Sequence, residues 1–76
     1  SSKVFGCIHE RWEDTRGVSV TSRETSNGYR IILIRESELG QMVDVEYLSN
    51  GSISKFYNRH YVIGDNLWLT AVKECQ

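Results

Sequence analysis

Residues 42–57 constrain the fold more than any other stretch of the chain, because their pattern is typical of a two-stranded β-hairpin. Apolar and polar residues alternate on both sides of Asn50 and Gly51, and Asn-Gly is the favoured pair for a two-residue turn with positive φ at both positions. A slip of one residue in the pairing would bury carboxylates, so the register is constrained. The pairs predicted from this turn are Leu48 with Ile53, Glu46 with Lys55, Val45 with Phe56 and Val43 with Asn58.

Turn-forming residues recur at nearly even spacing along the whole chain. Short strands at such spacing are typical of an all-β barrel or sandwich. We therefore expect a single all-β domain over residues 1–76, either a five- to six-stranded antiparallel meander or an SH3-like or OB-like barrel, with a short helix at either terminus as an alternative. The turn signals lie near residues 13–17, 25–28, 37–41, 49–52 and 64–66.

The four consecutive aliphatic residues 31–34 predict a central strand, because both faces of that strand are apolar. A strict two-residue turn at Asn27 and Gly28 would place aliphatic residues of this strand opposite arginines. We therefore expect a longer loop or a bulge between this strand and the one before it.

Two segments fit either a strand or a helix. In residues 3–12, Phe5, Ile8 and Trp12 recur at helical spacing, whereas an internal glycine and the β-branched residues favour an extended chain, and we expect a strand. In residues 65–75 an aspartate is suitably placed to cap a helix with an apolar stripe, but the run LWLTAV is equally typical of a closing strand, which we favour.

The composition argues against several classes of protein. Nine basic and ten acidic residues give a net charge of −1, so the chain lacks the global positive field of a dedicated duplex-DNA binder. No apolar run approaches the roughly 18 residues of a membrane span, and the residues given contain no signal peptide, so we expect no membrane partner and leave the compartment unknown. A chain of 76 residues also buries a small core, so a crosslink would matter more than in a larger domain.

The two cysteines, Cys7 and Cys75, lie near opposite ends of the chain. If the first and last strands pair to close a barrel, a disulfide across this span would stabilise the fold by about 4 kcal/mol. The alternative is two free thiols of an intracellular protein, which we favour because no compartment signal is present. Together with His9 and His60 they have the element types of a zinc site, but the only close pair is Cys7 and His9, so we expect no metal and no cofactor.

A basic and aromatic run at residues 55–61 is the strongest candidate for a binding surface. The hairpin register assigns Phe56 to the core and leaves neighbouring rings and cations on the outside. Aromatic rings in a basic groove hold single-stranded nucleic acid on small barrels, Tyr and Arg are frequent in protein interfaces, and tyrosines can frame a cage for a methylated lysine. The residues that we expect to make contact are Lys55, Tyr57, Arg59, His60 and Tyr61, with Trp12 as a further candidate.

The hairpin segment VDVEYLSNGSISKFY is similar to the V-x-V-x-Y and turn pattern of SH3-like barrels such as Tudor and KOW modules. The similarity covers this hairpin alone and implies a small β-barrel fold. The chain lacks the cage and glycine pattern of those modules, so the resemblance assigns no functional residue.

Catalysis requires a nucleophile or an acid–base pair with an orienting group, and the sequence presents no such set. We therefore expect a non-enzymatic module that binds another protein, as a small regulator or inhibitor that acts by occluding a surface. The alternative function is binding of single-stranded RNA or DNA on a β-barrel face. Pairing of two copies through an edge strand would give a homodimer as a third mode of association.

Overall fold

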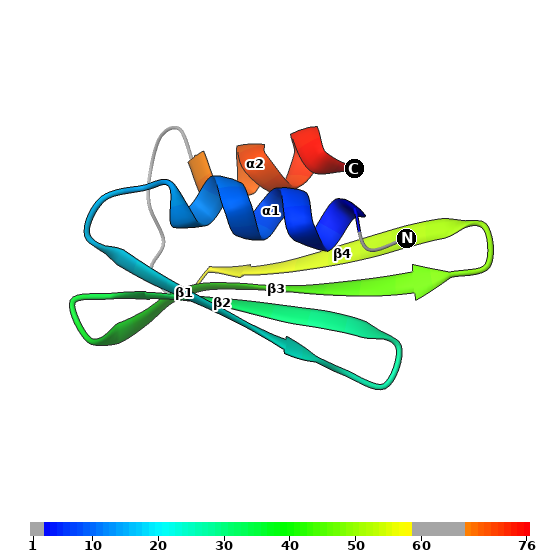
Figure 1. The fold of residues 1–76 in the computed structure, drawn as a ribbon, viewed down its shortest axis with the longest axis horizontal. Helices are drawn as coiled ribbons and strands as arrows, with labels where there is room; N and C mark the ends of the chain where they lie inside the picture. The colour runs from blue at the N-terminus through cyan, green and yellow to red at the C-terminus, as the bar shows by residue number, and fades with distance from the viewer. Residues whose placement is uncertain (1–2, 59–66) are drawn as a thin grey trace.

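The computed structural model describes residues 3–58 and 67–76, which form a four-stranded antiparallel sheet packed against two helices (Figure 1). The strands follow one another in the order β1-β2-β3-β4, and both helices lie on the same face of the sheet (Figure 1). The elements are α1 (Lys3–Glu13), β1 (Val18–Glu24), β2 (Gly28–Arg35), β3 (Glu38–Leu48), β4 (Gly51–Asn58) and α2 (Leu67–Cys75). The described fold is mostly β and a meander, as predicted. Its sheet is open and has four strands, so the prediction of a barrel and of five to six strands was wrong.

α1 forms where a strand was favoured, so the alternative of a short helix at the terminus is the correct one, and the spacing of its apolar residues explains why. A strand would place Phe5 on the face opposite to Ile8 and Trp12. In the helix all three lie on one side, where Ile8 and Trp12 are fully buried and Phe5 packs against the core. This burial outweighs the poor helix propensity of Gly6. The chain turns after the helix at Gly17, which has a φ of 79°.

α2 also forms where a strand was favoured, so the strand prediction was wrong for the described part of residues 65–75. Its residues on the sheet side recur at the i, i+3, i+4 and i+7 positions of one helix face. A strand would divide these residues between two faces. They are Trp68, Ala71, Val72 and Cys75, of which the last three are buried. Asp65, the predicted cap, lies outside the described residues.

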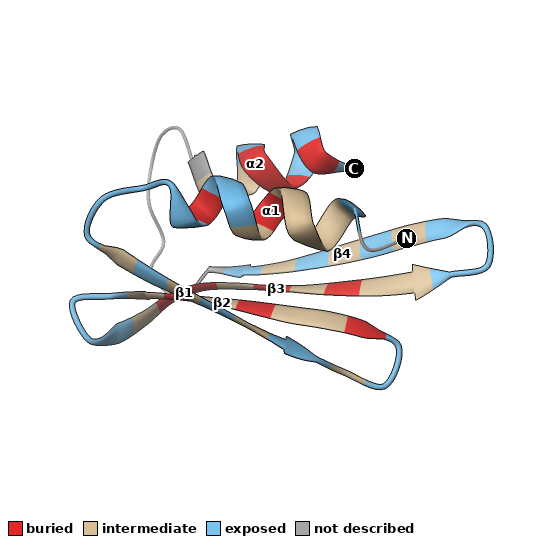
Figure 2. Ribbon diagram, viewed as in Figure 1, coloured by how far each residue is buried: buried red, intermediate tan, exposed pale blue. Residues whose placement is uncertain are grey.

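Trp12 lies at the centre of the core between the helices and the sheet. Its indole N–H donates a hydrogen bond of 3.1 Å to the backbone carbonyl of Trp68, and its ring contacts the rings of Phe56 and Trp68 edge to face. Figure 2 shows buried residues on both helices and along β2 and β3. The other buried apolar residues are Ile8, Ile31, Leu33, Val43, Val45, Ala71, Val72 and Cys75.

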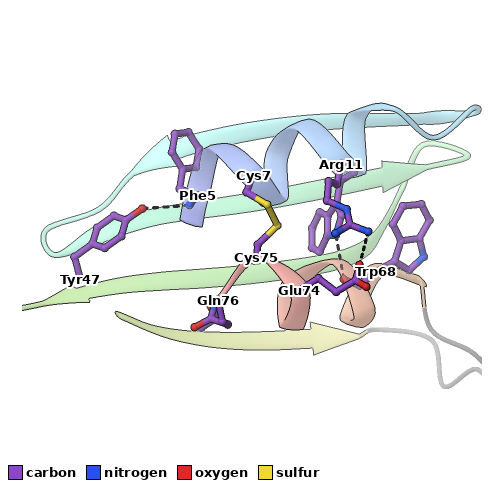
Figure 3. Close-up of a disulfide and its surroundings, with 10 residues drawn as sticks. Phe5, Cys7, Arg11, Tyr47, Trp68, Glu74, Cys75 and Gln76 are labelled. Carbon is purple, nitrogen blue, oxygen red and sulfur yellow. Dashed lines mark hydrogen bonds and ion pairs between the residues drawn. A yellow bond between two sulfur atoms is a disulfide. The ribbon is translucent and has the colours of Figure 1, made fainter. Parts of the chain in front are cut away.

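A disulfide between Cys7 and Cys75 joins α1 to α2 (Figure 3). The two Cα atoms are 5.7 Å apart, and the cysteines are separated by 68 positions in the sequence. The prediction of free thiols was therefore wrong, and the bond links two helices instead of two strands that close a barrel. In the chain-entropy model a crosslink over a loop of this length contributes about 4 kcal/mol, which is a large share of the stability of a small domain.

The hairpin of β3 and β4 has the predicted faces but not the predicted pairs. Its turn is formed by Ser49 and Asn50, one position earlier than expected, and Gly51 begins β4 with a φ of 152°. Each residue of β3 therefore lies opposite a residue of β4 two positions earlier than predicted. A shift of two residues keeps every side chain on its own face, so the inward and outward sets are as predicted. The observed pairs include Met42 with Tyr57, Val43 with Phe56 and Asp44 with Lys55.

A β-bulge in β3 sets the register between β2 and β3. Glu36 and Ser37 form the turn between these strands, with φ values of 54° and 64°, which is the backbone of a two-residue hairpin turn. The register then shifts by one residue between Leu39 and Gln41, so that Gly40 has no opposite residue in the pairing. Without this shift the inward residues of β3 would lie beside outward residues of β2.

The predictions for the first hairpin are confirmed. β2 lies between β1 and β3, as its two apolar faces predicted. The loop before it is longer than a two-residue turn, and the Thr25 N–H donates to the Gly28 carbonyl at 2.9 Å within that loop. Gly28 also packs closely on β3, because a Cβ atom at this position would lie 1.8 Å from the Val45 carbonyl oxygen.

Candidate functional site: the outer face of the sheet

The candidate site is the face of the sheet that points away from both helices, here called the outer face. Along β3, every second residue from Gln41 to Val45 is buried, whereas Met42 and Asp44 between them are partly exposed. No element of the described residues covers this side (Figure 1). The outward residues of the four strands are Ser19, Thr21, Arg23, Arg30, Ile32, Ile34, Leu39, Met42, Asp44, Glu46, Leu48, Ile53, Lys55 and Tyr57.

Four charged residues lie opposite one another across the four strands of the outer face, and we call them the charged row. Three cations and one carboxylate give this row a net charge of +2, although the whole chain carries −1. Neighbouring strands are about 4.8 Å apart, so the row spans about 14 Å. Glu46 lies on the same face beside the row, so the outer face as a whole has three cations and two carboxylates. The charged row consists of Arg23 on β1, Arg30 on β2, Asp44 on β3 and Lys55 on β4.

Arg30 and Asp44 form an ion pair with two hydrogen bonds in the middle of the charged row. The Nε of Arg30 donates to Oδ1 of Asp44 at 2.7 Å, and Nη2 donates to Oδ2 at 3.0 Å. These hydrogen bonds lower the pKa of Asp44 and raise the pKa of Arg30. Partial burial opposes the shift at Asp44, whereas the charges of Arg30, Lys55 and Arg23 lower the pKa of this carboxyl further. Asp44 is therefore ionised near neutral pH with Arg30 as its partner.

Two cations of the charged row exceed what the ion pair requires. Arg23 and Lys55 are both exposed, one on each edge strand. Arg23 lies directly opposite Arg30, and like charges in that arrangement destabilise a sheet. Residues that lower the stability of a fold are expected mainly at functional sites. Lys55, in contrast, lies directly opposite Asp44, so Arg23 is the member of the charged row whose cross-strand neighbour has the same charge.

A second row, here called the apolar row, lies next to the charged row on the outer face. The two rows are two positions apart along each strand, a distance of about 7 Å. Tyr57 in this row is 47% exposed, and Ile53 on the other side of the charged row is 45% exposed. Within the apolar row, Ile32, Met42 and Tyr57 lie opposite one another on neighbouring strands, and contiguous apolar surface marks an interaction site more often than scattered residues do. The apolar row consists of Thr21, Ile32, Met42 and Tyr57.

The outer face is hollowed beside the ion pair. The hollow has a volume of about 180 Å³. Sites for small-molecule ligands usually measure about 300–1,000 Å³, so this hollow is suited to a single side chain and not to a whole cofactor. Its lining comes from the loop before β2 and from β2, β3 and β4. The lining residues are Thr25, Asn27, Arg30, Asp44, Val45, Glu46, Lys55 and Tyr57.

The structure places the predicted contact residues in three different situations. Lys55 and Tyr57 are exposed on the outer face and line the same hollow. Trp12 is fully buried under α2 and against Phe56, so its prediction as a contact residue is corrected: the indole is part of the core. Arg59, His60 and Tyr61 lie outside the described residues.

Sequence reasoning missed the other members of the charged row, Arg23, Arg30 and Asp44. It placed Glu46 opposite Lys55, whereas the observed turn places Asp44 there. It also had no means to bring Arg30 and Asp44 together, because their pairing requires the register shift at Gly40. A glycine in the middle of a strand is the sequence signal that can indicate such a bulge.

Two polar contacts on the other face attach α1 to the sheet. The Phe5 N–H donates to the hydroxyl of Tyr47 at 3.2 Å (Figure 3). The His9 ring contacts the Ser22 hydroxyl through Nδ1 and the Glu13 carboxylate, at 3.3 Å, through Nε2. Serine, histidine and a carboxylate in series also occur in hydrolases, but here His9 and Ser22 are partly buried between helix and strand. We assign this contact to the packing of α1 on β1.

The described residues contain no group of three or more His, Cys, Asp or Glu side chains that could hold a metal ion. Cys7 and Cys75 are bonded to each other, so neither supplies a thiolate ligand. Among the described helices, none has the length and apolar character to cross a bilayer.

Comparison with known proteins gives no match: no protein-family model, no curated protein and no solved structure matches this chain.

Proposed function

We propose that this domain is a non-enzymatic module that binds another protein through its outer face, and that it regulates or inhibits that protein by occluding a surface. The observation that supports this proposal is the contrast between the two faces of one sheet. The inner face is covered by both described helices, whereas the outer face exposes apolar side chains and more cations than its ion pair requires.

The residue types of the outer face are those that dominate protein interfaces. Tyr and Arg are enriched among the residues that contribute most to binding, and Tyr57 lines one hollow together with Arg30 and Lys55. Burial of a half-exposed large side chain such as Tyr57 or Ile53 contributes about 1 kcal/mol. Two such contacts support weak to moderate binding once the entropy of association is subtracted.

The size of the outer face favours a short segment of a partner over a large globular surface. Strands of about eight residues at 3.4 Å per residue, in a sheet of four at 4.8 Å spacing, give a face of about 500 Å². A stable interface usually buries about 800 Å² on each partner. The outer face alone is therefore small for a permanent dimer and suited to a peptide-sized contact.

The test of this proposal is affinity capture from the native host, followed by direct titration of each recovered protein. The outer-face variant is Lys55→Ala with Tyr57→Ala. The matched control is Glu10→Ala with Lys73→Ala, two exposed positions on the helices. We expect the control to bind the recovered partner as the wild type does and the outer-face variant to bind at least about ten-fold more weakly. Equal binding by both variants would exclude the outer face.

The second candidate function is binding of single-stranded nucleic acid on the same face. Its support is the position of Tyr57 beside Lys55 and Arg30, since a ring among cations is suited to base stacking. Four-stranded sheets that hold RNA usually stack two or three bases on aromatic side chains. Tyr57 is the single aromatic side chain among the outward residues that the structure describes. This difference is why protein binding ranks first.

Two solution measurements separate these alternatives. Titration with a labelled random oligonucleotide at low and high salt detects nucleic-acid binding by its steep salt dependence, and no binding at low salt would exclude it. Light scattering detects a homodimer formed through an edge strand, β1 or β4, which stays a third proposal.

A further inference from the structure

We propose that the outer face selects an acidic partner segment: an extended stretch with two carboxylates about 14 Å apart, which crosses the four strands along the charged row. This inference rests on the proposed function and adds the chemistry of the partner to it.

The first argument is charge complementarity. Arg30 already pairs with Asp44, so the two terminal members of the row, Arg23 and Lys55, are the cations available to a partner. The ion pair uses two of the five guanidinium N–H groups of Arg30 and leaves three others that these bonds do not engage. A carboxylate of the partner gains attraction at Arg23 and at Lys55, whereas a basic segment would meet three cations and one carboxylate.

The second argument is the match between the length of the row and the repeat of an extended chain. Arg23 and Lys55 are three strand spacings apart, or about 14 Å. In an extended segment, side chains on the same side recur every second residue, and positions i and i+4 are about 13 Å apart. Acidic residues at i and i+4 therefore reach the two ends of the row from one side of a single strand.

The third argument concerns the residue between the two acids. Position i+2 of the segment lies over the middle of the row, beside the hollow of about 180 Å³. The charged residues that line the hollow are Arg30 with Asp44 and Lys55 with Glu46, whose charges sum to zero, so an uncharged side chain fits it better than a charged one. Tyr57 and Met42, in the apolar row, offer contact to its apolar part. The expected pattern is acidic, any, uncharged, any, acidic.

The position of Glu46 is a further constraint on the segment. Glu46 lines the hollow and lies two residues from Asp44, toward the turn at Ser49 and Asn50. Carboxylates of the partner placed over Glu46 would be repelled. The acidic residues of the partner are thus expected over the charged row, or on the side of it that faces the apolar row and lies away from Glu46.

The experiment is selection from a random library of twelve-residue peptides on the immobilised wild-type protein. Because the library is random, it does not bias the charge of the selected peptides. Enriched peptides are then synthesised and titrated by fluorescence anisotropy against three variants. These are Arg23→Glu with Lys55→Glu, Asp44→Asn, and the control Lys73→Glu on the helix side. Circular dichroism establishes that each variant is folded.

We expect enriched peptides with a net negative charge and acidic residues four positions apart. The double reversal should weaken their binding by about ten-fold or more, and added salt should weaken binding to the wild type. Asp44→Asn should tighten binding by about two- to five-fold, because it removes a carboxylate that repels the acidic residues of the peptide. Lys73→Glu should leave the affinity within about two-fold.

Three results would overturn the inference. Enriched peptides that are neutral or basic, and that lose affinity with Tyr57→Ala, would disprove the acidic partner but leave the proposed function in place. Peptides that bind equally to all outer-face variants, or no enrichment at all, would overturn both. A random single-stranded oligonucleotide is compared with the best peptide at 150 mM salt, where the Debye length is about 8 Å. If the oligonucleotide binds more tightly, the charged row would be assigned to phosphates.

Discussion

The two faces of the sheet differ in how their side chains are covered, although the same strands form both. On the inner face, alternate residues such as Val43 and Val45 are buried beneath helices that are themselves joined by a disulfide. On the outer face, the neighbouring residues Met42 and Asp44 stay partly exposed, and like charges lie opposite one another on β1 and β2. The inner face accounts for the stability of the domain. Among the residues that the structure describes, no element packs on the outer face, and we propose that this face serves the function.

The largest effect should follow from truncation at the centre of the inner side. Trp12→Ala removes a fully buried indole and its contacts with Phe56 and Trp68, which should cost about 3–5 kcal/mol of unfolding free energy. A domain of this size has only about 4–11 kcal/mol in total, so the variant should be near its unfolding limit. Urea denaturation measures the change. A loss below about 1 kcal/mol would place Trp12 outside the core and end the contrast between the faces.

Loss of the disulfide should have the second largest effect. Replacing Cys7 and Cys75 together by serine should lower the unfolding free energy by about 2–4 kcal/mol, because the loop is long and because α2 is too short to be stable alone. Thermal unfolding of the wild type with and without a thiol reductant provides the same comparison without a mutation. An unchanged midpoint in reductant would contradict the role of the crosslink.

The ion pair of the charged row should contribute a small, pH-dependent part of the stability. The pKa of Asp44 is below its ordinary value of 3.8 in the folded state, so the pair stabilises the fold above that pH and loses this contribution as the pH falls further. Asp44→Asn should remove this pH-dependent part and leave the rest of the acid unfolding curve unchanged. Superimposable curves for variant and wild type between pH 2 and 5, measured by circular dichroism, would contradict the assignment.

The smallest effect on stability is expected at Tyr57, although this residue is a proposed contact for binding. Tyr57→Ala on the outer face should change the unfolding free energy by no more than about 0.5 kcal/mol, since the ring is 47% exposed and lies on an edge strand. Phe56→Ala, one residue earlier and inward, is the matched comparison and should cost several times more. Equal losses at the two positions would show that the outer ring also belongs to the fold.

The sequence was informative where a pattern is local. Alternation along residues 42–57 gave the correct inward and outward sets, and the apolar run at 31–34 gave an internal strand. For the two helices the sequence left strand and helix open, and the strand was favoured because Gly6 and the β-branched residues argue locally against a helix. The burial of Ile8 and Trp12 against the sheet, at the helical spacing noted in the sequence, decided the conformation.

Some residues of the candidate site could be predicted from local patterns, and others could not. Lys55 and Tyr57 follow from alternation within one hairpin, so their exposure could be foreseen. Arg30 and Asp44 come together only because of the bulge at Gly40. In the sequence, that glycine is the only signal of the one-residue shift in register. Trp12 was misplaced because its helix was taken for a strand.

The central claim is that the outer face serves binding and not folding, and one variant tests both halves of it. Arg23→Thr with Lys55→Thr removes the two terminal cations of the charged row and introduces residues with good strand propensity. The account predicts an unfolding free energy that is unchanged within about 0.5 kcal/mol or higher, together with weaker binding of the partner recovered by the wild type. A loss of more than about 1 kcal/mol with unchanged affinity would show that the charged row exists for the fold, and would contradict the account.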